Sequence, residues 1–355
     1  MNIVSIVGAR PQFIKLAPLS KVLRENHNEV IIHTGQHYDA NMSAVFFEKL
    51  NIPKPDINLS IGSSNHGKQT GEMLIKLEEQ LIKMQPDFVI VFGDTNTTLA
   101  GALAASKLNI KLAHIEAGLR SFNKKMPEEK NRILTDHLSD ILFCPTENAV
   151  ENLKNEGIKK NVYQVGDIMY DSVLCFSGKA AKNSNILKKN NISQNKYFLA
   201  TIHRAENTDN KIKLSIIFNA LNELELPVLL PLHPRTENSM NKYQINKNNF
   251  KNINFISPVE YLEMLDLVKN SKKVLTDSGG LQKEAYFLDK LCITLRDETE
   301  WEETLKGNWN VLAKINKDDI INKTKIHKVD HEEKKNNYFG DGKTALRIIN
   351  ILNSF

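Results

Sequence analysis

Short apolar runs alternate with longer amphipathic segments along almost the whole chain. Runs rich in Val, Ile, Leu and Phe indicate buried strands, and the longer segments indicate helices with one apolar face. In the first half we expect strands at Ile3–Val7, Val30–Thr34, Phe88–Phe92, Lys111–Ile115 and Ile141–Cys144. The helices expected there are Gln12–Arg24, Ala40–Lys49, Gly67–Lys83, Thr97–Lys107, Lys130–Leu138 and Glu147–Glu156.

The same alternation continues through the second half of the chain. The strands expected there are Tyr197–Ile202, Val228–Pro231, Ile253–Ile256, Val274–Thr276, Leu291–Leu295 and Asn310–Leu312. Strands that alternate with helices form parallel sheets that are covered by helices. The pattern therefore predicts an α/β fold made of two doubly wound, Rossmann-like domains that face each other across a cleft.

The length of the chain also favours two domains, because 355 residues are too many for one ordinary core. We place an N-terminal domain at residues 1–167 and a C-terminal domain at residues 168–339. The link between them is expected within Val165–Asp171. Residues 340–355 predict a closing helix that packs back on the N-terminal domain.

Composition narrows the class of protein. With 41% hydrophobic and 25% charged residues the chain is typical of globular proteins, and no apolar run has the length of a membrane span. The first residues enter a strand without a basic leader or a cleavage site. We therefore expect a cytoplasmic protein with no membrane partner.

The net charge of +5 does not predict a nucleic-acid partner, because the excess lysines are spread over Lys/Asn-rich stretches without interleaved aromatic residues. The three cysteines have no metal-binding spacing, and neither an Asp-rich metal loop nor a G-x-x-x-x-G-K-[ST] loop is present. No metal site is predicted.

Candidate chemistry follows the predicted strands, because ligands of doubly wound sheets bind outside the carboxyl ends of the strands. The stretch Leu275–Thr304 passes from an apolar strand through Ser278, Gly279 and Gly280 into a helical pattern. Free amides and the positive dipole at a helix N-terminus bind phosphate, and glycine lets the ligand come close. Glu284, farther along that helix, has a carboxylate that can accept sugar hydroxyls. The alternative is a capping turn without a ligand.

The loop after the first strand, G-A-R-P-Q-F-I-K, carries two cations beside a helix N-terminus. Arg10 and Lys15 there suit a bound diphosphate, although surface cations that cap a turn would give the same pattern. The loop lacks the G-x-G-x-x-G spacing of a dinucleotide fold, so no nicotinamide cofactor is predicted. Gln36 and His37 follow the second strand and are weaker candidates for the same edge.

Three acids follow the third and fourth strands. Asp94 and Glu116 come at strand ends, and Glu128 lies in the first turn of a helix with Arg132 at i+4 on the same face. Helix capping and dipole pairing are the structural alternatives. Unpaired carboxylates that crowd together raise each other's pKa and so suit proton transfer near neutral pH.

Histidine and arginine pairs end two strands of the second domain. His203 and Arg204 follow its first strand, and His233 and Arg235 follow its second. Arg296 and Glu300 follow a later strand at the same edge. Two successive strand ends with this pattern predict a binding site, whereas a single histidine at a strand end is usually structural. Arg296 and Glu300, together with Arg132, are candidates for contact with the substrate or a regulatory ligand.

Eight ordered motifs spread over nearly the whole chain resemble those of the non-hydrolysing UDP-N-acetylglucosamine 2-epimerases. They are G-A-R-P-Q-F-I-K-L-A-P, G-Q-H-Y-D, G-D-T-N-T-T-L-A, H-I-E-A-G-L-R, M-P-E-E-K-N-R, T-I-H-R-A-E-N, T-D-S-G-G-L-Q-K-E and R-D-E-T-E-W-E-E-T. The resemblance implies a glycosyltransferase-B type fold, a homodimer, and interconversion of UDP-GlcNAc and UDP-ManNAc by UDP elimination and re-addition. It also implies a place in surface polysaccharide synthesis, including lipopolysaccharide or capsule, and no cofactor.

The resemblance assigns roles to single residues. Asp94, Glu116 and Glu128 match the catalytic acids, and His203 belongs to both the catalytic and the UDP-binding sets. Gln36 and His37 match a region that in some members binds a second, regulatory UDP-sugar. The UDP-binding set, completed by the residues of the candidate loops above, is Arg10, Lys15, His203, His233, Arg235, Ser278, Gly279, Gly280 and Glu284.

Three motifs resemble more closely the branch of the family that acts on UDP-2,3-diacetamido-2,3-dideoxyglucuronate: G-A-R-P-Q-F-I-K, S-F-N-K-K-M-P-E-E and R-D-E-T-E-W. Lys124 and Lys125 would then receive the substrate carboxylate. A glycosyltransferase of the same fold is the alternative from another class, although it has no reason to carry three acids at one rim.

Overall fold

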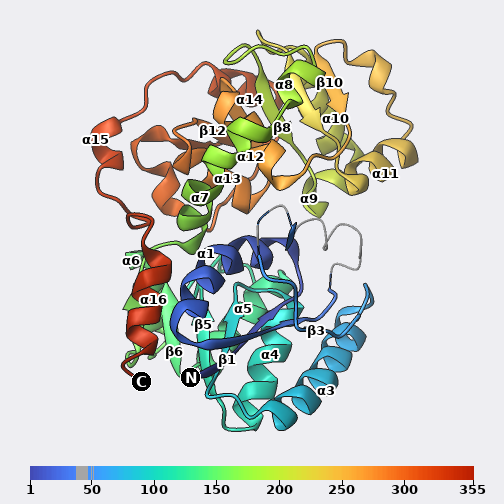
Figure 1. The fold of residues 1–355 in the computed structure, drawn as a ribbon. Coiled ribbons are helices and arrows are strands. Elements are labelled where there is room, and N and C mark those ends of the chain that lie inside the picture. Colours follow the sequence, from blue (N-terminus) through green and yellow to red (C-terminus); the bar gives the residue numbers. More distant parts are fainter. Residues whose placement is uncertain (37–46, 49, 51) are drawn as a thin grey trace. The chain divides into compact units, whose positions relative to one another are not determined.

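A computed structural model describes residues 1–36, 47–48, 50 and 52–355. Contacts within the chain divide it into two compact units. Unit 1 comprises Met1–Ser172 and Asn337–Phe355, and unit 2 comprises Val173–Asn336. Each unit has its own parallel sheet with helices packed around it (Figure 1).

The sheet of unit 1 has seven parallel strands in the order β3-β2-β1-β4-β5-β6-β7. The order reverses direction between β1 and β4, which is the switch point of a doubly wound fold. The strands are β1 (Asn2–Val7), β2 (Asn28–His33), β3 (Ile57–Asn58), β4 (Phe88–Phe92), β5 (Lys111–Ile115), β6 (Ile141–Cys144) and β7 (Val162–Gln164).

Helices of unit 1 pack against one another as well as on the sheet: α3 on α4, α4 on α5, and α1 on the C-terminal α16. Asp171 accepts hydrogen bonds from the backbone N–H groups of Thr344 and Ala345 at the start of α16, at 3.1 and 2.9 Å. The helices are α1 (Arg10–Asn26), α3 (His66–Met84), α4 (Asn96–Lys107), α5 (Pro127–Leu138), α6 (Glu147–Asn155) and α16 (Thr344–Leu352), and α7 (Ile168–Asn183) crosses the boundary between the units.

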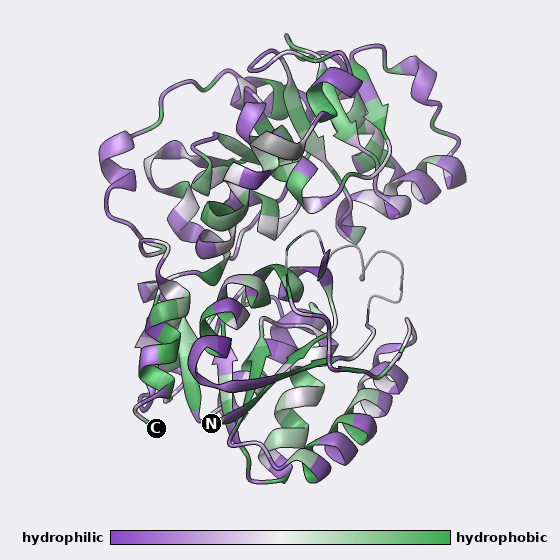
Figure 2. Cartoon of the chain, viewed as in Figure 1, coloured by the Kyte–Doolittle hydropathy of each residue, from purple (hydrophilic) through white to green (hydrophobic). Residues whose placement is uncertain are grey.

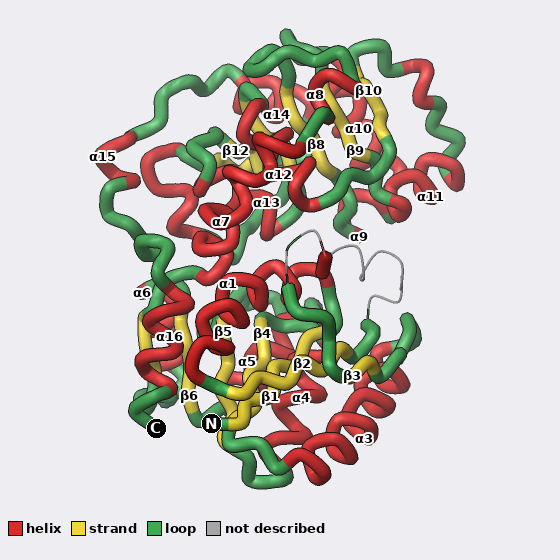
Figure 3. The backbone as a smooth tube through the Cα atoms, viewed as in Figure 1, coloured by secondary structure: helices red, strands yellow, loops and turns green. Residues whose placement is uncertain are grey.

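The sheet of unit 2 has six parallel strands in the order β10-β9-β8-β11-β12-β13, again doubly wound. Figure 2 shows hydrophobic residues along the strands of both sheets, and Figure 3 shows the helices around them. The strands are β8 (Phe198–Thr201), β9 (Val228–Pro231), β10 (Ile253–Ile256), β11 (Lys273–Thr276), β12 (Cys292–Thr294) and β13 (Asn310–Leu312).

Apolar side chains fill both faces of the unit 2 sheet, in two separate clusters around residues such as Phe218 and Leu267. The helices of this unit are α8 (Ile186–Lys189), α9 (Ala205–Thr208), α10 (Lys211–Asn222), α11 (Pro234–Lys242), α12 (Tyr261–Asn270), α13 (Gly279–Phe287), α14 (Lys317–Thr324) and α15 (His331–Lys334), with 3-10 turns at η1 (Lys247–Asn249) and η2 (Glu302–Asn308).

The predicted α/β class with two doubly wound sheets is confirmed, and every predicted strand is present to within two residues at each end. Two strands escaped prediction: β3 has two residues and β7 three, and both are only partly buried, so neither has a periodic apolar pattern. The helix predicted at Ala40–Lys49 lies largely outside the described residues.

Candidate active site

The loop after β1 is fixed by a buried glutamine that the sequence did not single out. Gln12 Oε1 accepts the backbone N–H groups of Gly8 and Ala9 at 2.8 and 3.0 Å. Its Nε2 donates to the carbonyl of Phe92 at 2.9 Å, at the end of β4. Gln12 therefore ties together the loops on either side of the switch point, where ligands of this fold bind.

Lys15 and Glu116 form a buried ion pair at the carboxyl edge of the unit 1 sheet. Both side chains are 8% exposed. Lys15 lies on α1, and Glu116 follows β5 directly with a left-handed backbone, φ +72°. A left-handed conformation is costly for a residue with a long side chain, and strained backbone of this kind clusters at functional sites. The pair packs over Gly93. A Cβ atom at this position would lie 3.1 Å from both Glu116 Oε2 and Lys15 Nζ.

Asp94 forms an ion pair with Arg132, which is the more buried of the two. The Arg132 side chain is 4% exposed, whereas that of Asp94 is 34% exposed, and their charged groups are 2.5 Å apart. Arg132 also pairs with Glu129 at 3.0 Å. Asn131 Nδ2 donates to the carbonyl of Asp94 at 3.0 Å, so two successive residues of α5 fix this loop.

Glu129 is a second residue that sequence reasoning missed. It is buried, and its carboxylate accepts the backbone N–H groups of Ser121 and Phe122 at 2.9 and 2.8 Å. It thereby holds the loop before α5, in which Lys124 and Lys125 are exposed. Its neighbour Glu128 is more exposed than Glu129. The sequence pattern alone does not show which of these two adjacent glutamates is buried.

The three predicted acids come from segments that hydrogen bonds and packing connect, but the expectation that they are unpaired is wrong for Glu116 and Asp94. Glu116 is paired with Lys15, and Asp94 with Arg132. Glu128 lies one turn before Arg132 in α5. Lys15 lies 101 residues from Glu116, and Arg132 lies 38 residues from Asp94, so these two pairs were invisible before folding.

Gln36 lies at the same edge and caps α4. Its Oε1 accepts the backbone N–H of Thr97 at 3.0 Å and the Thr97 hydroxyl at 2.8 Å. Arg10 is partly exposed at the start of α1. His37, the neighbour of Gln36, lies outside the described residues.

In unit 2, the loop after β11 leads directly into α13, as the sequence predicted. Ser278 is the N-cap of this helix, and its hydroxyl accepts the backbone N–H of Leu281 at 3.5 Å. A Cβ added to Gly280 would have no atom within 4 Å, whereas one added to Gly279 would lie 2.7 Å from Glu300 Oε1. Glu284, on the same helix, is buried. The first turn of α13 thus offers an open backbone at Gly280.

Asp277 organises the loop that carries His203. This aspartate is fully buried, and its carboxylate accepts the backbone N–H groups of His203 and Arg204, both at 3.0 Å, and the Asn207 side chain at 3.1 Å. The His203 ring is 34% exposed. Burial lowers the pKa of His203, and the nearby guanidinium groups of Arg204 and Arg235 lower it further against the opposing charge of Asp277. Sequence reasoning missed both Asp277 and Asn207.

His233 and Arg235 follow β9 at the same edge. The His233 ring lies 5.2 Å from that of His203, centre to centre. Its Nδ1 accepts the backbone N–H of Arg235 at 3.1 Å, which caps α11. Arg235 is about half exposed and pairs with Asp209 at 3.3 Å. The two predicted histidines are therefore brought together, as the strand-end pattern implied.

Arg296 and Glu300 form a buried ion pair beside the start of α13, at 2.8 Å. Burial alone would raise the pKa of Glu300, but the charge of Arg296 and further hydrogen bonds outweigh it, so that this pKa is lowered. Arg204 lies 3.8 Å from the same carboxylate. Glu300 therefore contacts two cations, the buried Arg296 and the more exposed Arg204.

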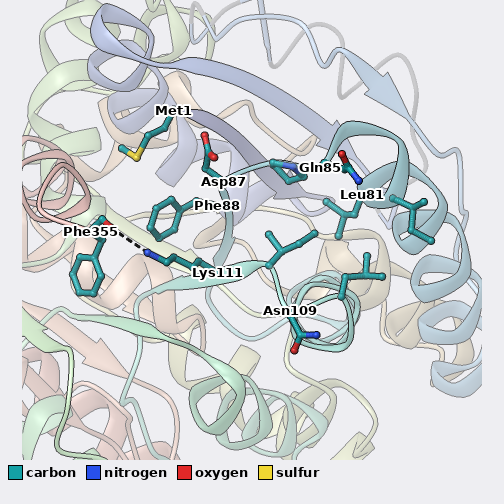
Figure 4. A pocket seen from close by; sticks show the side chains of 12 residues that line it. Met1, Leu81, Gln85, Asp87, Phe88, Asn109, Lys111 and Phe355 are labelled. Atoms are coloured by element: carbon teal, nitrogen blue, oxygen red, sulfur yellow. Dashed lines mark hydrogen bonds between the residues drawn. The ribbon is translucent and has the colours of Figure 1, made fainter.

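A pocket of about 760 Å³ lies away from all of these residues (Figure 4). It is lined by Met1, Phe88 and Lys111, at the amino ends of the strands, where Lys111 Nζ donates to the carbonyl of Phe355. In the part of the chain that the structure describes, no cluster of three metal-ligating side chains occurs. None of the described helices combines the length and apolarity needed to cross a membrane.

Comparisons with known proteins give one family. The family model for UDP-N-acetylglucosamine 2-epimerase matches residues 21–353. A Methanococcus maripaludis UDP-N-acetylglucosamine 2-epimerase homolog is 56% identical, and the Pseudomonas aeruginosa UDP-2,3-diacetamido-2,3-dideoxy-D-glucuronate 2-epimerase 49%, each over 99% of both chains. The crystal structure of Methanocaldococcus jannaschii UDP-GlcNAc 2-epimerase in complex with UDP-GlcNAc and UDP superposes with a TM-score of 0.91, at 46% identity and full coverage of both chains.

Proposed function

The chain belongs to the UDP-N-acetylglucosamine 2-epimerase family, and on this basis we propose that it is an isomerase that interconverts UDP-GlcNAc and UDP-ManNAc without hydrolysing them. The reaction inverts C2 of the sugar. The C2–H bond is only weakly acidic, so direct removal and return of the proton is unfavourable. Departure of UDP from C1 in the same step makes its removal feasible.

The first half of the reaction is an elimination. One carboxylate among Asp94, Glu116 and Glu128 takes the C2 proton, and the electron pair of the C2–H bond forms the C1–C2 double bond. The C1–O bond breaks and its electrons leave with UDP, which gives a 2-acetamidoglucal. Return of a proton to the other face of C2, with re-addition of UDP at C1, completes the inversion. Atoms and charge balance without a cofactor.

Residues of unit 2 bind the nucleotide in this proposal. The free amides at the start of α13 and the side chains of His203 and Arg204 oppose the negative charge that grows on the departing diphosphate. Glu284 accepts ribose hydroxyls. Arg10 and Lys15, which the sequence also predicts to bind UDP, belong to unit 1, where Lys15 pairs with Glu116.

The observation that carries the proposal is that Asp94 and Glu116 are each held by an ion pair at the carboxyl edge of the unit 1 sheet. Their loops follow neighbouring strands β4 and β5, and a buried cation fixes each carboxylate. Fixed carboxylates of this kind serve proton transfer, because their positions are set before the substrate arrives. A fold that only bound a nucleotide would have no need of them.

The substituents at C3 and C6 of the sugar are a separate question. Identity does not favour the diacetamido-glucuronate, because its 2-epimerase is 49% identical and a UDP-N-acetylglucosamine 2-epimerase from Methanococcus maripaludis is 48% identical. The exposed Lys124 and Lys125 support the uronate only if a C6 carboxylate reaches them. We keep UDP-GlcNAc as the proposed substrate.

The deciding experiment is incubation with UDP-GlcNAc, and in parallel with the diacetamido-glucuronate, in D₂O. Deuterium at C2 of both epimers, without any acceptor, is the expected result for the preferred substrate. Absence of C2 deuterium from both substrates would overturn the proposal. Release of free UDP with ManNAc would instead identify a hydrolysing epimerase.

A glycosyltransferase of the same fold is distinguished by the same reaction. It would transfer the sugar only when an acceptor is added, and it would leave C2 unlabelled. A UDP-sugar sensor would bind the ligand and exchange nothing.

We further propose that the enzyme acts in the cytoplasm as a homodimer and supplies a precursor of surface polysaccharide such as lipopolysaccharide or capsule. The exposed Ile75 and Ile82, seven residues apart on α3, support an apolar contact with a second copy. Light scattering tests the dimer, and a monomeric mass at micromolar concentration would exclude it. Replacement of Ile75 by Glu is expected to shift the mass toward the monomer.

A further inference from the structure

A fully buried histidine connects the two loops that carry the proposed catalytic acids. His114 is the fourth residue of β5 and has no exposed surface. Its Nε2 lies 2.7 Å from the carbonyl of Gly93, the residue before Asp94. A carbonyl can only accept, so Nε2 donates this hydrogen bond.

The other nitrogen of His114 contacts α5. Its Nδ1 lies 2.7 Å from Asp136 Oδ1. The second oxygen of Asp136 accepts the backbone N–H of Gly118 at 3.1 Å and the Arg120 guanidinium at 2.7 Å. One buried carboxylate thus holds both the imidazole ring and the loop that follows Glu116.

Arg120 closes the network at its far end. It donates to the carbonyl of Leu119 at 2.6 Å and to both oxygens of Glu156, at 2.6 and 2.7 Å. The hydrogen bond with Arg120 lowers the pKa of Glu156, which is consistent with a tight pair. Every buried polar atom in this chain of contacts has a partner, as a rigid network requires.

The backbone beside both acids needs such support. Gly93 and Glu116 both have left-handed backbones, with φ of +64° and +72°. For a residue with a side chain, this conformation is strained and persists only where its surroundings hold it. His114 donates to the Gly93 carbonyl, one residue from Asp94, and Asp136 accepts from the Gly118 amide, two residues from Glu116.

We propose that His114 is a positioning residue, which rests on the proposed epimerase function: it ties the Gly93 carbonyl to Asp136 and so fixes the separation of the Asp94 and Glu116 carboxylates. It touches neither the substrate nor the reacting atoms. Its effect is therefore on turnover, through the geometry of proton transfer, and not on the binding of UDP.

Two substitutions separate the two hydrogen bonds of the ring. In His114→Gln the amide nitrogen takes the place of Nε2 and keeps the donor toward Gly93. In His114→Asn it takes the place of Nδ1 and keeps only the donor toward Asp136. We expect kcat to fall about 10- to 100-fold in His114→Asn, with KM and the UDP dissociation constant unchanged. His114→Gln should retain most of the activity.

Equal losses of kcat in the two variants, or no loss in His114→Asn, would overturn the inference, since either result means that the Gly93 bond does not matter. Should both variants fail to fold, Asp136→Asn tests the other end of the tie, because it leaves one acceptor oxygen for the His114 ring, the Gly118 amide and the Arg120 guanidinium, which two oxygens hold in the wild type. A kcat that stays within twofold in this variant contradicts the proposal.

Amide hydrogen exchange gives a readout that does not need activity. We expect the segment 92–97, which contains the Gly93 carbonyl, to exchange faster in His114→Asn than in His114→Gln, with β8 as the internal control. If the wild-type chain fails to label C2 in D₂O, the proposed function fails, while this exchange pattern still decides the role of His114.

Discussion

The carboxyl edges of the two sheets place charge in opposite ways. In unit 1, buried cations support acids that are equally or more exposed: Arg132 is 4% exposed below Asp94 at 34%. In unit 2, buried acids support outer cations and histidines: Asp277 has no exposed surface below His203 at 34%. Glu300, 8% exposed, pairs in the same way with Arg204 at 29%.

The comparison shows that one fold can present either sign of charge at the same place. A charge taken out of water needs a partner, and each of the outer groups compared here has a buried partner of opposite sign. The buried partner also orients the outer group before any ligand arrives. Unit 1 therefore suits proton transfer, and unit 2 suits a diphosphate.

The largest effect is expected from removing charge at the unit 1 edge. Glu116→Gln and Asp94→Asn should each lower kcat by about 10²- to 10⁴-fold, because a proton acceptor is lost while the shape is kept. UDP affinity should be unchanged. Epimer formation followed by NMR, with calorimetric titration of UDP, measures both.

Glu79→Gln, at an exposed position of α3, is the matched control and should retain wild-type turnover. Full activity in Glu116→Gln or in Asp94→Asn would remove that residue from the mechanism and leave the edge with a structural ion pair only.

A smaller effect, on UDP affinity, is expected in unit 2. Asp277→Asn replaces an oxygen that accepts backbone N–H groups with an amide that donates. A hydrogen bond to a charged group contributes about 1.5–3 kcal/mol, so we expect UDP to bind about 10- to 100-fold more weakly. Calorimetric titration measures it, with the melting temperature as a check of folding. A UDP affinity within twofold of wild type would contradict the proposal that buried acids in unit 2 support the groups that bind the diphosphate.

Two adjacent glycines sharpen the picture of the nucleotide site. Gly280→Ala meets no protein atom within 4 Å, so the free energy of unfolding should stay unchanged or rise by up to about 1 kcal/mol. UDP binding should weaken about tenfold, because the methyl group keeps the diphosphate from the helix amides.

Gly279→Ala is the counterpart, since its Cβ would lie 2.7 Å from Glu300 Oε1 and push this carboxylate from Arg296. We expect it to lower the unfolding free energy by about 1–3 kcal/mol. Urea unfolding of both variants checks this. Tight UDP binding by Gly280→Ala would mean that no ligand approaches this backbone.

The smallest effect is expected for the ion pair between Arg120 and Glu156 in unit 1. The hydrogen bond with Arg120 lowers the pKa of Glu156 below its ordinary 4.5 in the folded chain. The unfolded chain then binds the proton more readily, so the stabilisation is present above pH 4.5 and is lost as pH falls through the folded pKa. Glu156→Gln should lower stability at pH 7 and flatten its decline below pH 4.5. Urea unfolding across pH 3–7 tests the prediction, and an unchanged slope would contradict it.

The fold was largely readable from the sequence because buried parallel strands are continuous apolar runs. Runs such as Val89–Val91 and the pair Val274 and Leu275 are fully buried and cannot be mistaken for loops. β3 and β7 were missed, since two or three half-buried residues give no period. Their places depend on pairing with β2 and β6, which is a tertiary fact.

The candidate site was readable only in part. Loops after strands identified Asp94, Glu116, His203 and Ser278, because doubly wound sheets place their ligands there. Glu129 and Asp277 were not among the predicted site residues. What distinguishes them is burial and the backbone N–H groups that they accept, which no spacing encodes.

The sequence by itself determined the two doubly wound sheets, the strand ends at which chemistry is expected, and the family resemblance. Tertiary structure alone decided which charges are partners: Lys15 with Glu116, 101 residues apart, and Arg132 with Asp94, 38 apart. The physical reason is that apolar period is a local property of the chain. Charge pairing is decided only when folding removes both groups from water and brings together segments that are distant in sequence.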